Sequence, residues 1–283
     1  MTRWAAVIGS PIAHSLSPVL HRTAYRLAGL DWEYRQFEVT ESSFPEFAES
    51  LDGDCAGISV TMPCKQVALS FADVSDGLAK TVGAANTLVP AAGLWGAFNT
   101  DVHGIVESVR APFGDTLEEF AAQNRAARKQ AVIIGTRATA SSALAAAMTL
   151  GFDQVSVVGR SFQGAGNVTL AAGRLGVSFT PIKWDRTDLV REVLSRADLV
   201  LSTVPAEASA QLVEFAAPRP DQILLDVTYA AHSELTQTFV DAGALVIDPL
   251  AMLVYQGLAQ VKLMSGHEVA FEPVYREVVA ASK

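Results

Sequence analysis

The side chains best suited to chemistry lie in residues 57–65, which read Gly57-Ile58-Ser59-Val60-Thr61-Met62-Pro63-Cys64-Lys65. A short apolar run there ends in hydroxyl side chains. Pro63 suits the first position of a helix, because its missing N–H would have no partner there anyway, so we predict a helix from Pro63 to Phe71. Lys65 then lies in the first turn, where the helix dipole disfavours cations. Its position near the hydroxyls indicates proton transfer, with a solvated surface lysine as the alternative.

Three further groups of polar side chains lie at or just after predicted strand ends: Ser15 with Ser17, Asn86 with Thr87, and Asn99 with Asp101. In open α/β sheets, ligands bind at the carboxyl ends of the strands. We therefore expect these groups to gather with Ser59, Thr61 and Lys65 at one edge and to form a cleft that binds a polyol. Each group also has a structural interpretation, since Ser17 and Asp101 would suit helix N-caps and Asn86 would suit a turn.

Alternating strands and helices position these groups within the first 104 residues. The sequence predicts strands over 4–9, 32–39, 56–60, 83–89 and 93–98, and helices over 17–28, 43–51, 63–71 and 76–82. Ser17 is the predicted N-cap of the first helix, with Pro18 at the first helical position. This alternation predicts an α/β domain with a mainly parallel sheet.

A second alternation of strands and helices follows in residues 105–245. Strands are predicted over 131–134, 154–158, 177–182, 198–201 and 222–227, with helices between them, the first of which ends at Leu150. This pattern is typical of a doubly wound, Rossmann-like domain. The last part of the chain, 246–283, predicts two helices, over 251–264 and 273–281.

The turn after the first strand of this second domain has the position of a dinucleotide-binding fingerprint but lacks its glycines. Gly135 is present, while Arg137 and Ala138 stand where glycines are expected. Arg160 ends the second strand, where NAD-binding proteins carry an acidic residue for the ribose 2′-hydroxyl. Arginine pairs with a phosphate through two hydrogen bonds, so Arg160 favours NADP over NAD, with Arg137 adding to the phosphate site and an ordinary surface arginine as the alternative. Residues 202–205 follow another strand end and are expected to line the cofactor groove.

Size, composition and charge exclude several classes of protein. The 283 residues suit two domains at ~150 residues each, and the net charge of −9 argues against a nucleic-acid partner. No apolar run reaches about 18 residues, so we expect neither a membrane span nor a membrane partner, and the first residues do not resemble a signal peptide. Two cysteines indicate a reducing compartment and hence a cytoplasmic location. The scattered histidines predict no metal site, and we expect a monomer or homodimer that acts on a small molecule.

Seven motifs together resemble those of the shikimate dehydrogenase family, along nearly the whole chain. They are residues 7–18, residues 59–65, Gly83-Ala84-Ala85-Asn86-Thr87, Asn99-Thr100-Asp101, Ser202-Thr203-Val204-Pro205, Asp226-Val227-Thr228-Tyr229 and Met252-Leu253-Val254-Tyr255-Gln256. The resemblance implies a substrate domain formed by residues 1–104 and 246–283, an NADP-binding domain formed by residues 105–245, and C-terminal helices that return to the first domain. It also implies reversible, NADPH-dependent reduction of 3-dehydroshikimate to shikimate, a step in aromatic amino acid biosynthesis.

The resemblance also implies a role for each matching residue. Lys65 and Asp101 would form the catalytic pair. The substrate-binding residues would be Ser15 and Ser17 for the carboxylate, Thr61, Asn86, Asp101 and Gln256 for the ring hydroxyls, Tyr229 at the carboxylate end, and Ser59, which stands where the family more often has Asn. The cofactor-binding residues would be Gly135, Arg137, Ala138, Thr139, Arg160, Ser161, Thr203, Val204, Val227, Pro249 and Met252.

Two other functions fit the same residues. A quinate/shikimate dehydrogenase of the same family would oxidise quinate as well and use NAD, against which Arg160 argues. A non-catalytic shikimate-binding protein with a weakened cofactor site would explain the missing glycines after Gly135. The presence of both Lys65 and Asp101 argues against it, since a binding protein has no need of that pair.

Overall fold

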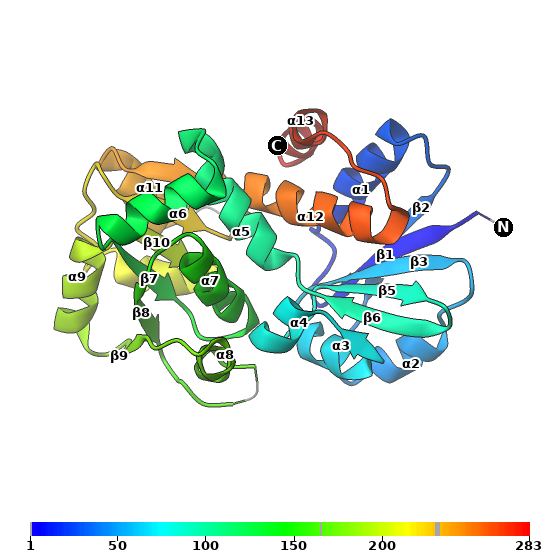
Figure 1. Ribbon diagram of the computed structural model, residues 1–283, viewed down its shortest axis with the longest axis horizontal. Helices are drawn as coiled ribbons and strands as arrows, with labels where there is room; N and C mark the ends of the chain where they lie inside the picture. Colours follow the sequence, from blue (N-terminus) through cyan, green and yellow to red (C-terminus); the bar gives the residue numbers. More distant parts are fainter. Residues whose placement is uncertain (1, 165, 230–232) are drawn as a thin grey trace. The chain divides into compact units, whose positions relative to one another are not determined.

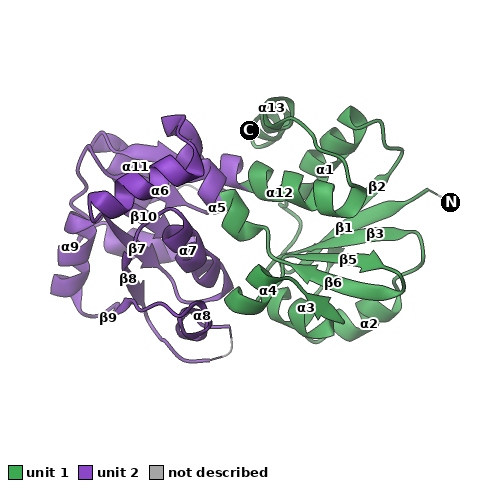
Figure 2. Ribbon diagram, in the orientation of Figure 1, with its two compact units in different colours: residues 1–104, 253–283 green, residues 105–252 purple. Residues whose placement is uncertain are grey.

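The computed structural model describes residues 2–164, 166–229 and 233–283, and the chain divides into two compact units. Unit 1 comprises residues 1–104 and 253–283, and unit 2 comprises residues 105–252 (Figure 2). Each unit has its own six-stranded sheet in the described part of the chain. The second boundary between the units lies at 252/253, within a helix, whereas the sequence predicted a boundary at 245/246.

Unit 1 is built on a mainly parallel sheet with one reversed strand (Figure 1). Its strands are β1 (Trp4–Gly9), β2 (Glu33–Glu38), β3 (Cys55–Val60), β4 (Val74–Ser75), β5 (Thr87–Ala91) and β6 (Leu94–Phe98). Its helices are α1 (Ser17–Leu27), α2 (Phe44–Glu49), α3 (Lys65–Phe71), α4 (Gly77–Val82) and α13 (Phe271–Ala281), together with the start of α5 (Asp101–Arg110) and most of α12 (Pro249–Ser265). The strand order is β2-β1-β3-β5-β6-β4, and β5 runs antiparallel to both β3 and β6.

The reversed direction of β5 decides which loops share an edge of this sheet. The carboxyl ends of β1, β3 and β6 lie at one edge, and the amino end of β5 joins them there. Helices α2, α3 and α4 pack apolar side chains on one face of the sheet, and Figure 2 shows α1, α12 and α13 on the other. Both faces are therefore buried, and the edge with the polar loops is the part of the sheet that can meet a ligand.

Two helices of unit 1 begin differently from the prediction. Helix α3 begins at Lys65, two residues after Pro63, because the N–H of Cys64 donates to the carbonyl of Thr61 (2.9 Å) and closes a turn first. Helix α1 begins at Ser17 itself, so the prediction that Ser17 is its N-cap is wrong. The hydroxyl of Ser15 instead accepts the N–H of Ser17 at 3.3 Å.

Unit 2 is a doubly wound domain in which all neighbouring strand pairs are parallel. The strands, in the order β12-β11-β10-β7-β8-β9, are β7 (Gln130–Ile134), β8 (Gln154–Gly159), β9 (Thr180–Lys183), β10 (Leu199–Ser202), β11 (Ile223–Asp226) and β12 (Leu245–Ile247). The helices are α6 (Leu117–Ala126), α7 (Ala138–Thr149), α8 (Val168–Leu175), α9 (Thr187–Arg196), α10 (Ala206–Ser209) and α11 (Glu234–Asp241), with 3₁₀ turns at Ala111–Phe113 and Ala210–Leu212. Helices α5, α6 and α11 were not predicted from the sequence.

Apolar side chains fix the packing of unit 2. Val190 and Leu194 of α9 and Phe239 of α11 are buried against strand residues that include Val132 and Leu224. Burial of such side chains contributes about 1.5–3 kcal/mol each, which makes this core the main source of stability of the sheet. In the described ranges, no helix is both long enough and apolar enough to cross a membrane.

Candidate active site

Lys65 and Asp101 form an ion pair at the polar edge of the unit 1 sheet. Lys65 is the first residue of α3, which follows β3, and Asp101 is the first residue of α5, which follows β6. The Nζ of Lys65 donates to Oδ2 of Asp101 at 2.6 Å, and only 13% and 7% of the two side chains are exposed. A carboxylate this close holds the ammonium in one orientation through a charge-assisted hydrogen bond. Residues from two different predicted strand ends are thus brought together.

Asn86 links this pair to its surroundings. The Oδ1 of Asn86 accepts the N–H of Thr100 (2.8 Å) and the hydroxyl of Thr87 (2.9 Å). Its Nδ2 therefore faces the other way, where it donates to Oδ1 of Asp101 at 2.9 Å and to Oε1 of Gln256 at 3.2 Å. Both oxygens of the Asp101 carboxylate thus have a donor, and the partners of Asn86 fix the orientation of its amide.

Gln256 reaches this cluster from a distant part of the sequence. It lies on α12, and only 9% of the residue is exposed. Its Nε2 donates to the carbonyl of Leu253 at 2.9 Å, which leaves Oε1 for the amide of Asn86. The sequence predicted a buried Gln256, and the structure confirms its burial. A buried amide whose partners lie at a polar edge is well placed to contact hydroxyl groups of a ligand.

Ser15, Ser17 and Thr61 follow the carboxyl ends of β1 and β3, with Ser15 and Thr61 in loops and Ser17 at the start of α1. Thr61 directly follows β3, and its N–H donates to the carbonyl of Ile8 on β1 at 2.9 Å. A Cβ atom on Gly9 would lie 2.4 Å from the Cγ2 of Thr61, so only glycine fits at the end of β1. This close approach holds Thr61, at the start of the loop after β3, against the end of β1, from which the segment with the two serines follows. The predicted hydroxyl groups therefore belong to one edge.

Ser59 and Gln260 are hydrogen-bonded to each other inside the protein. The Ser59 hydroxyl accepts a hydrogen bond from the hydroxyl of Tyr34 (2.7 Å) and donates to Oε1 of Gln260 (2.8 Å). Ser59 is 3% exposed and Gln260 is 2% exposed. The sequence placed Gln260 one helical turn after Gln256 but assigned it no role, because its partner lies 201 positions earlier in the chain.

A buried histidine lies beside the start of α1, where Ser17 is the first residue. The ring of His21 stacks on the ring of Tyr34 with centroids 4.0 Å apart, and its Nδ1 lies 3.0 Å from the carbonyl oxygen of Ser17. Burial lowers the pKa of His21 to about 4, against a smaller opposing effect of the Ser17 carbonyl. The ring is therefore neutral near pH 7, and the hydrogen bond requires its Nδ1 to carry the proton.

Acid is expected to destabilise the protein through His21. The unfolded chain binds a proton at this histidine near pH 6.5, whereas the folded chain resists protonation down to about pH 4. Stability therefore falls as the pH drops from 6.5 toward 4, by about 2 kcal/mol at pH 5. In His21→Phe, which keeps a ring against Tyr34, urea unfolding at pH 7 and pH 5 should show a difference smaller by about that amount. Equal pH dependence in both proteins would contradict the assignment.

In unit 2, Gly135 forms the tight turn that the sequence predicted after the first strand. Its φ is +118°, and a Cβ atom there would lie 2.3 Å from Oγ1 of Thr203. Thr203 in turn donates from that hydroxyl to the carbonyl of Ile134 at 2.8 Å. The turn therefore brings the end of β7 against residues 203 and 204. Helix α7 then begins at Ala138. A helix amino terminus behind a glycine turn suits a phosphate group.

Cationic side chains accompany this turn. Arg137 directly precedes α7 in an extended conformation. Arg160 follows β8, its side chain is exposed, and the hydroxyl of the adjacent Ser161 accepts the N–H of Gln163 at 3.2 Å. Gly135, Arg137, Thr139 and Arg160 thus lie at the carboxyl ends of the first two strands of the unit or just beyond them, where the predicted cofactor site would be.

Other predicted cofactor residues follow later strands of unit 2. Val227 comes directly after β11, and its N–H donates to the carbonyl of Ser202 at the end of β10 (3.0 Å). Pro249 is the first residue of α12, and Met252 is buried in its first turns. Tyr229, predicted to line the carboxylate end of the substrate, follows β11 and is half-buried. These residues follow β11 and β12 and therefore belong to the same end of the unit 2 sheet as Gly135.

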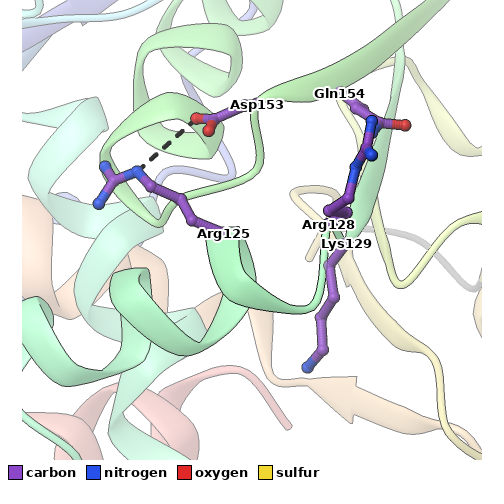
Figure 3. Close-up of a pocket in the computed structure, with 6 residues that line it drawn as sticks. Arg125, Arg128, Lys129, Asp153 and Gln154 are labelled. Carbon is purple, nitrogen blue, oxygen red and sulfur yellow. Dashed lines mark ion pairs between the residues drawn. The ribbon is translucent and has the colours of Figure 1, made fainter.

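A basic pocket in unit 2 lies at the opposite end of these strands. Arg125, Arg128, Lys129, Gly151, Asp153 and Gln154 line it, and β7 and β8 begin beside them (Figure 3). Arg125 pairs with Asp153 (3.8 Å), while Arg128 points toward Gln154 and Lys129 points away from it. The cations do not converge on one point, so this pocket lacks the arrangement that an anion would need.

Comparison with known proteins gives a consistent result. A sequence model described as the shikimate dehydrogenase substrate binding domain matches residues 7–88. The shikimate dehydrogenase (NADP(+)) of Ignicoccus hospitalis is 29% identical over 98% of this chain and 98% of its own length. That of a Nostoc species is 30% identical over 93% of this chain and 90% of its own length. The crystal structure of Mycobacterium tuberculosis shikimate dehydrogenase matches 99% of both chains with 32% identity and a TM-score of 0.83.

Proposed function

Because this chain belongs to the shikimate dehydrogenase family, we propose that it catalyses the reversible reduction of 3-dehydroshikimate to shikimate with NADPH. The observation that carries the proposal is the Lys65–Asp101 pair, whose carboxylate is held by Asn86. A ketone reductase needs a proton donor for the oxygen that becomes the hydroxyl, and a lysine ammonium supplies one. The two free, buried cysteines, Cys55 and Cys64, suit a cytoplasmic location for this step.

Lys65 acts on the oxygen of the reacting carbon. In the direction of reduction, its ammonium donates a proton to the carbonyl oxygen as negative charge develops there, and in oxidation the neutral amine takes the proton from the hydroxyl. Asp101 keeps the ammonium directed at that oxygen and accepts a hydrogen bond from a neighbouring hydroxyl. NADPH supplies the hydride when it is bound.

The remaining polar groups of the site bind the rest of the substrate. We assign the ring hydroxyls to Thr61, Asn86 and Gln256, whose side chains offer both donors and acceptors. Ser15 and Ser17 bind the carboxylate by donating hydroxyl hydrogens. These uncharged donors can bind the carboxylate of a small polyol without a cationic side chain beside it.

The residues of unit 2 fit a phosphorylated dinucleotide. Gly135 allows the tight turn in which Thr203 packs where a Cβ atom would lie, and the amino terminus of α7 follows within three residues. We assign the pyrophosphate to this turn and the 2′-phosphate to Arg160 with Ser161, and the remaining contacts to Ala138, Thr139, Thr203, Val204, Val227, Pro249 and Met252. This set fits NADP although only one glycine of the usual fingerprint is present.

Four assays on the purified protein test the proposal, each following absorbance of the reduced nicotinamide. Shikimate and quinate are each offered with NADP and with NAD. Activity confined to shikimate with NADP is the expected result. Turnover of quinate with NAD would favour the quinate/shikimate alternative and reject the role of Arg160. Failure in all four, together with measurable shikimate binding, would favour a non-catalytic binding protein.

Arg160 is expected to set the preference for NADP. Replacing it by Ala should raise the KM for NADP roughly ten- to hundredfold, because one or two charge-assisted hydrogen bonds to the 2′-phosphate are lost, while the KM for NAD stays unchanged. Arg191, which is also exposed but lies on α9, gives the matched control. Arg191→Ala should leave both values unchanged. An equal rise for NADP and NAD in Arg160→Ala would show that Arg160 does not read the 2′-phosphate.

A further inference from the structure

A continuous chain of hydrogen bonds leads from Tyr34 to Asn86, beside the catalytic pair. The Tyr34 hydroxyl donates to Ser59, and Ser59 donates to Oε1 of Gln260. The Nε2 of Gln260 donates to the hydroxyl of Thr87 at 3.1 Å and to the carbonyl of Asn86 at 2.9 Å. Thr87 then donates its own hydrogen to Oδ1 of Asn86. Each group in this chain is 3% exposed or less, so water does not replace a missing partner.

The direction of every donor in the chain is determined. Burial raises the pKa of Tyr34, so its phenol keeps its proton and donates. Ser59 has one hydrogen, which is given to Gln260, and Gln260 must therefore present its amide nitrogen to Thr87. Thr87 has no free hydrogen left for another group. The Oδ1 of Asn86 is thus supplied with a donor, and its Nδ2 is left to face Asp101.

We propose that Ser59 and Gln260 are positioning residues for the reaction, which hold the amide of Asn86 with its nitrogen toward Asp101 and do not contact the substrate. This inference rests on the proposed function. It changes the assignment of Ser59, which the resemblance of the sequence gives as a substrate-binding residue. The Ser59 hydroxyl donates to Gln260 and accepts from Tyr34, and it is buried below the edge where Thr61 and Lys65 lie.

Gln260→Glu is the sharpest test, because it keeps the shape of the side chain and reverses its polarity. A carboxylate in place of the amide nitrogen cannot donate to Thr87, so the Thr87 hydroxyl turns toward Glu and leaves Oδ1 of Asn86. The Oδ1 of Asn86 then keeps the N–H of Thr100 as its donor but loses the Thr87 hydroxyl, so the nitrogen of the amide is held toward Asp101 less firmly. Ser59→Ala interrupts the chain one step earlier with a smaller change in volume, and Ser59→Thr keeps the hydroxyl and serves as the conservative variant.

A buried glutamine in unit 2 gives the control for general damage. Gln222 is 0% exposed, and its Nε2 donates to the carbonyls of Leu194 and Ala197. Gln222→Glu makes the same chemical change at a site with no link to Asn86. It should lower the free energy of unfolding and leave kcat unchanged.

We expect kcat for shikimate oxidation to fall roughly tenfold in Ser59→Ala and more in Gln260→Glu, with KM for shikimate within about threefold of wild type. Ser59→Thr should recover most of the loss in kcat. These results separate a positioning role from a structural one.

Three outcomes would overturn the inference while the proposed function stands. One is a rise in KM for shikimate of tenfold or more in Ser59→Ala at unchanged kcat, which would make Ser59 a substrate ligand. Another is a loss of kcat in Gln260→Glu no larger than in Gln222→Glu, and the third is a Ser59→Thr variant that is as slow as Ser59→Ala. Absence of turnover in the wild-type protein would instead reject the proposed function, and this inference with it.

Discussion

Replacing Lys65 by Met should lower kcat roughly 10²- to 10⁴-fold and leave the KM for shikimate nearly unchanged. Met keeps most of the side-chain stem but has no amine to take the proton from the hydroxyl on the reacting carbon. Hydride would then have to leave a carbon whose hydroxyl keeps its proton. Steady-state rates with saturating NADP, together with shikimate binding by calorimetry, separate the loss of chemistry from a loss of binding.

The same substitution leaves the buried carboxylate of Asp101 without its cation. Breaking one side of a poorly exposed ion pair costs about 3–5 kcal/mol, so Lys65→Met should also unfold more easily. The double variant with Asp101→Asn removes both charges and should recover part of that stability but none of the activity. Recovery of turnover in the double variant, or near-normal turnover of Lys65→Met, would remove Lys65 from the mechanism.

The sequence predicts the alternation of strands and helices in this protein because apolar runs and capping residues act locally. The strand from Trp4 to Gly9 and the helix after Asp76 depend on a few neighbouring residues, and the structure has both. Asp76 accepts the N–H of Ala79 at 2.6 Å, as a predicted helix start requires. Local interactions of this kind are visible without knowledge of the fold.

The start of a helix is less predictable where several residues compete for it. Pro63 suits the first position of a helix, yet α3 begins two residues later, at Lys65. Ser17 suits an N-cap, yet it is already the first residue of α1. In both places a hydrogen bond in the preceding loop decides the start: the Ser15 hydroxyl accepts the N–H of Ser17, and the Thr61 carbonyl accepts the N–H of Cys64, the residue before α3. The residue at which each helix begins depends on the conformation of the preceding loop, and the loop sequence has no strong pattern that predicts it.

The convergence of the site depends on topology that local patterns do not contain. Asn86 reaches the same edge as Lys65 and Asp101 only because β5 runs against its neighbours. The bond between Ser59 and Gln260 spans 201 positions and joins a strand to a helix near the end of the chain. Residue types at strand ends predict the members of the site, whereas the order of donors and acceptors among them requires the three-dimensional structure.

Replacing Asp101 by Asn should have an effect on kcat close to that of losing Lys65, although the residue gives no proton. Each carboxylate oxygen of Asp101 accepts a hydrogen bond, one from Lys65 at 2.6 Å and one from Asn86 at 2.9 Å. An amide at this position turns one of those oxygens into an NH₂ group, which then faces another donor whichever way it is rotated. The ammonium of Lys65 loses the partner that directs it.

We therefore expect kcat to fall at least about 100-fold in Asp101→Asn, with a KM for shikimate higher by several-fold because a contact to a ring hydroxyl also changes. Asp188 lies in the first turn of α9 as Asp101 lies in the first turn of α5, so Asp188→Asn controls for the interaction of an acid with a helix dipole. That control should cost less than about 1 kcal/mol of stability and no activity. If Asp101→Asn behaved in the same way, the carboxylate would serve only the helix, and Lys65 would have to be directed by the substrate itself.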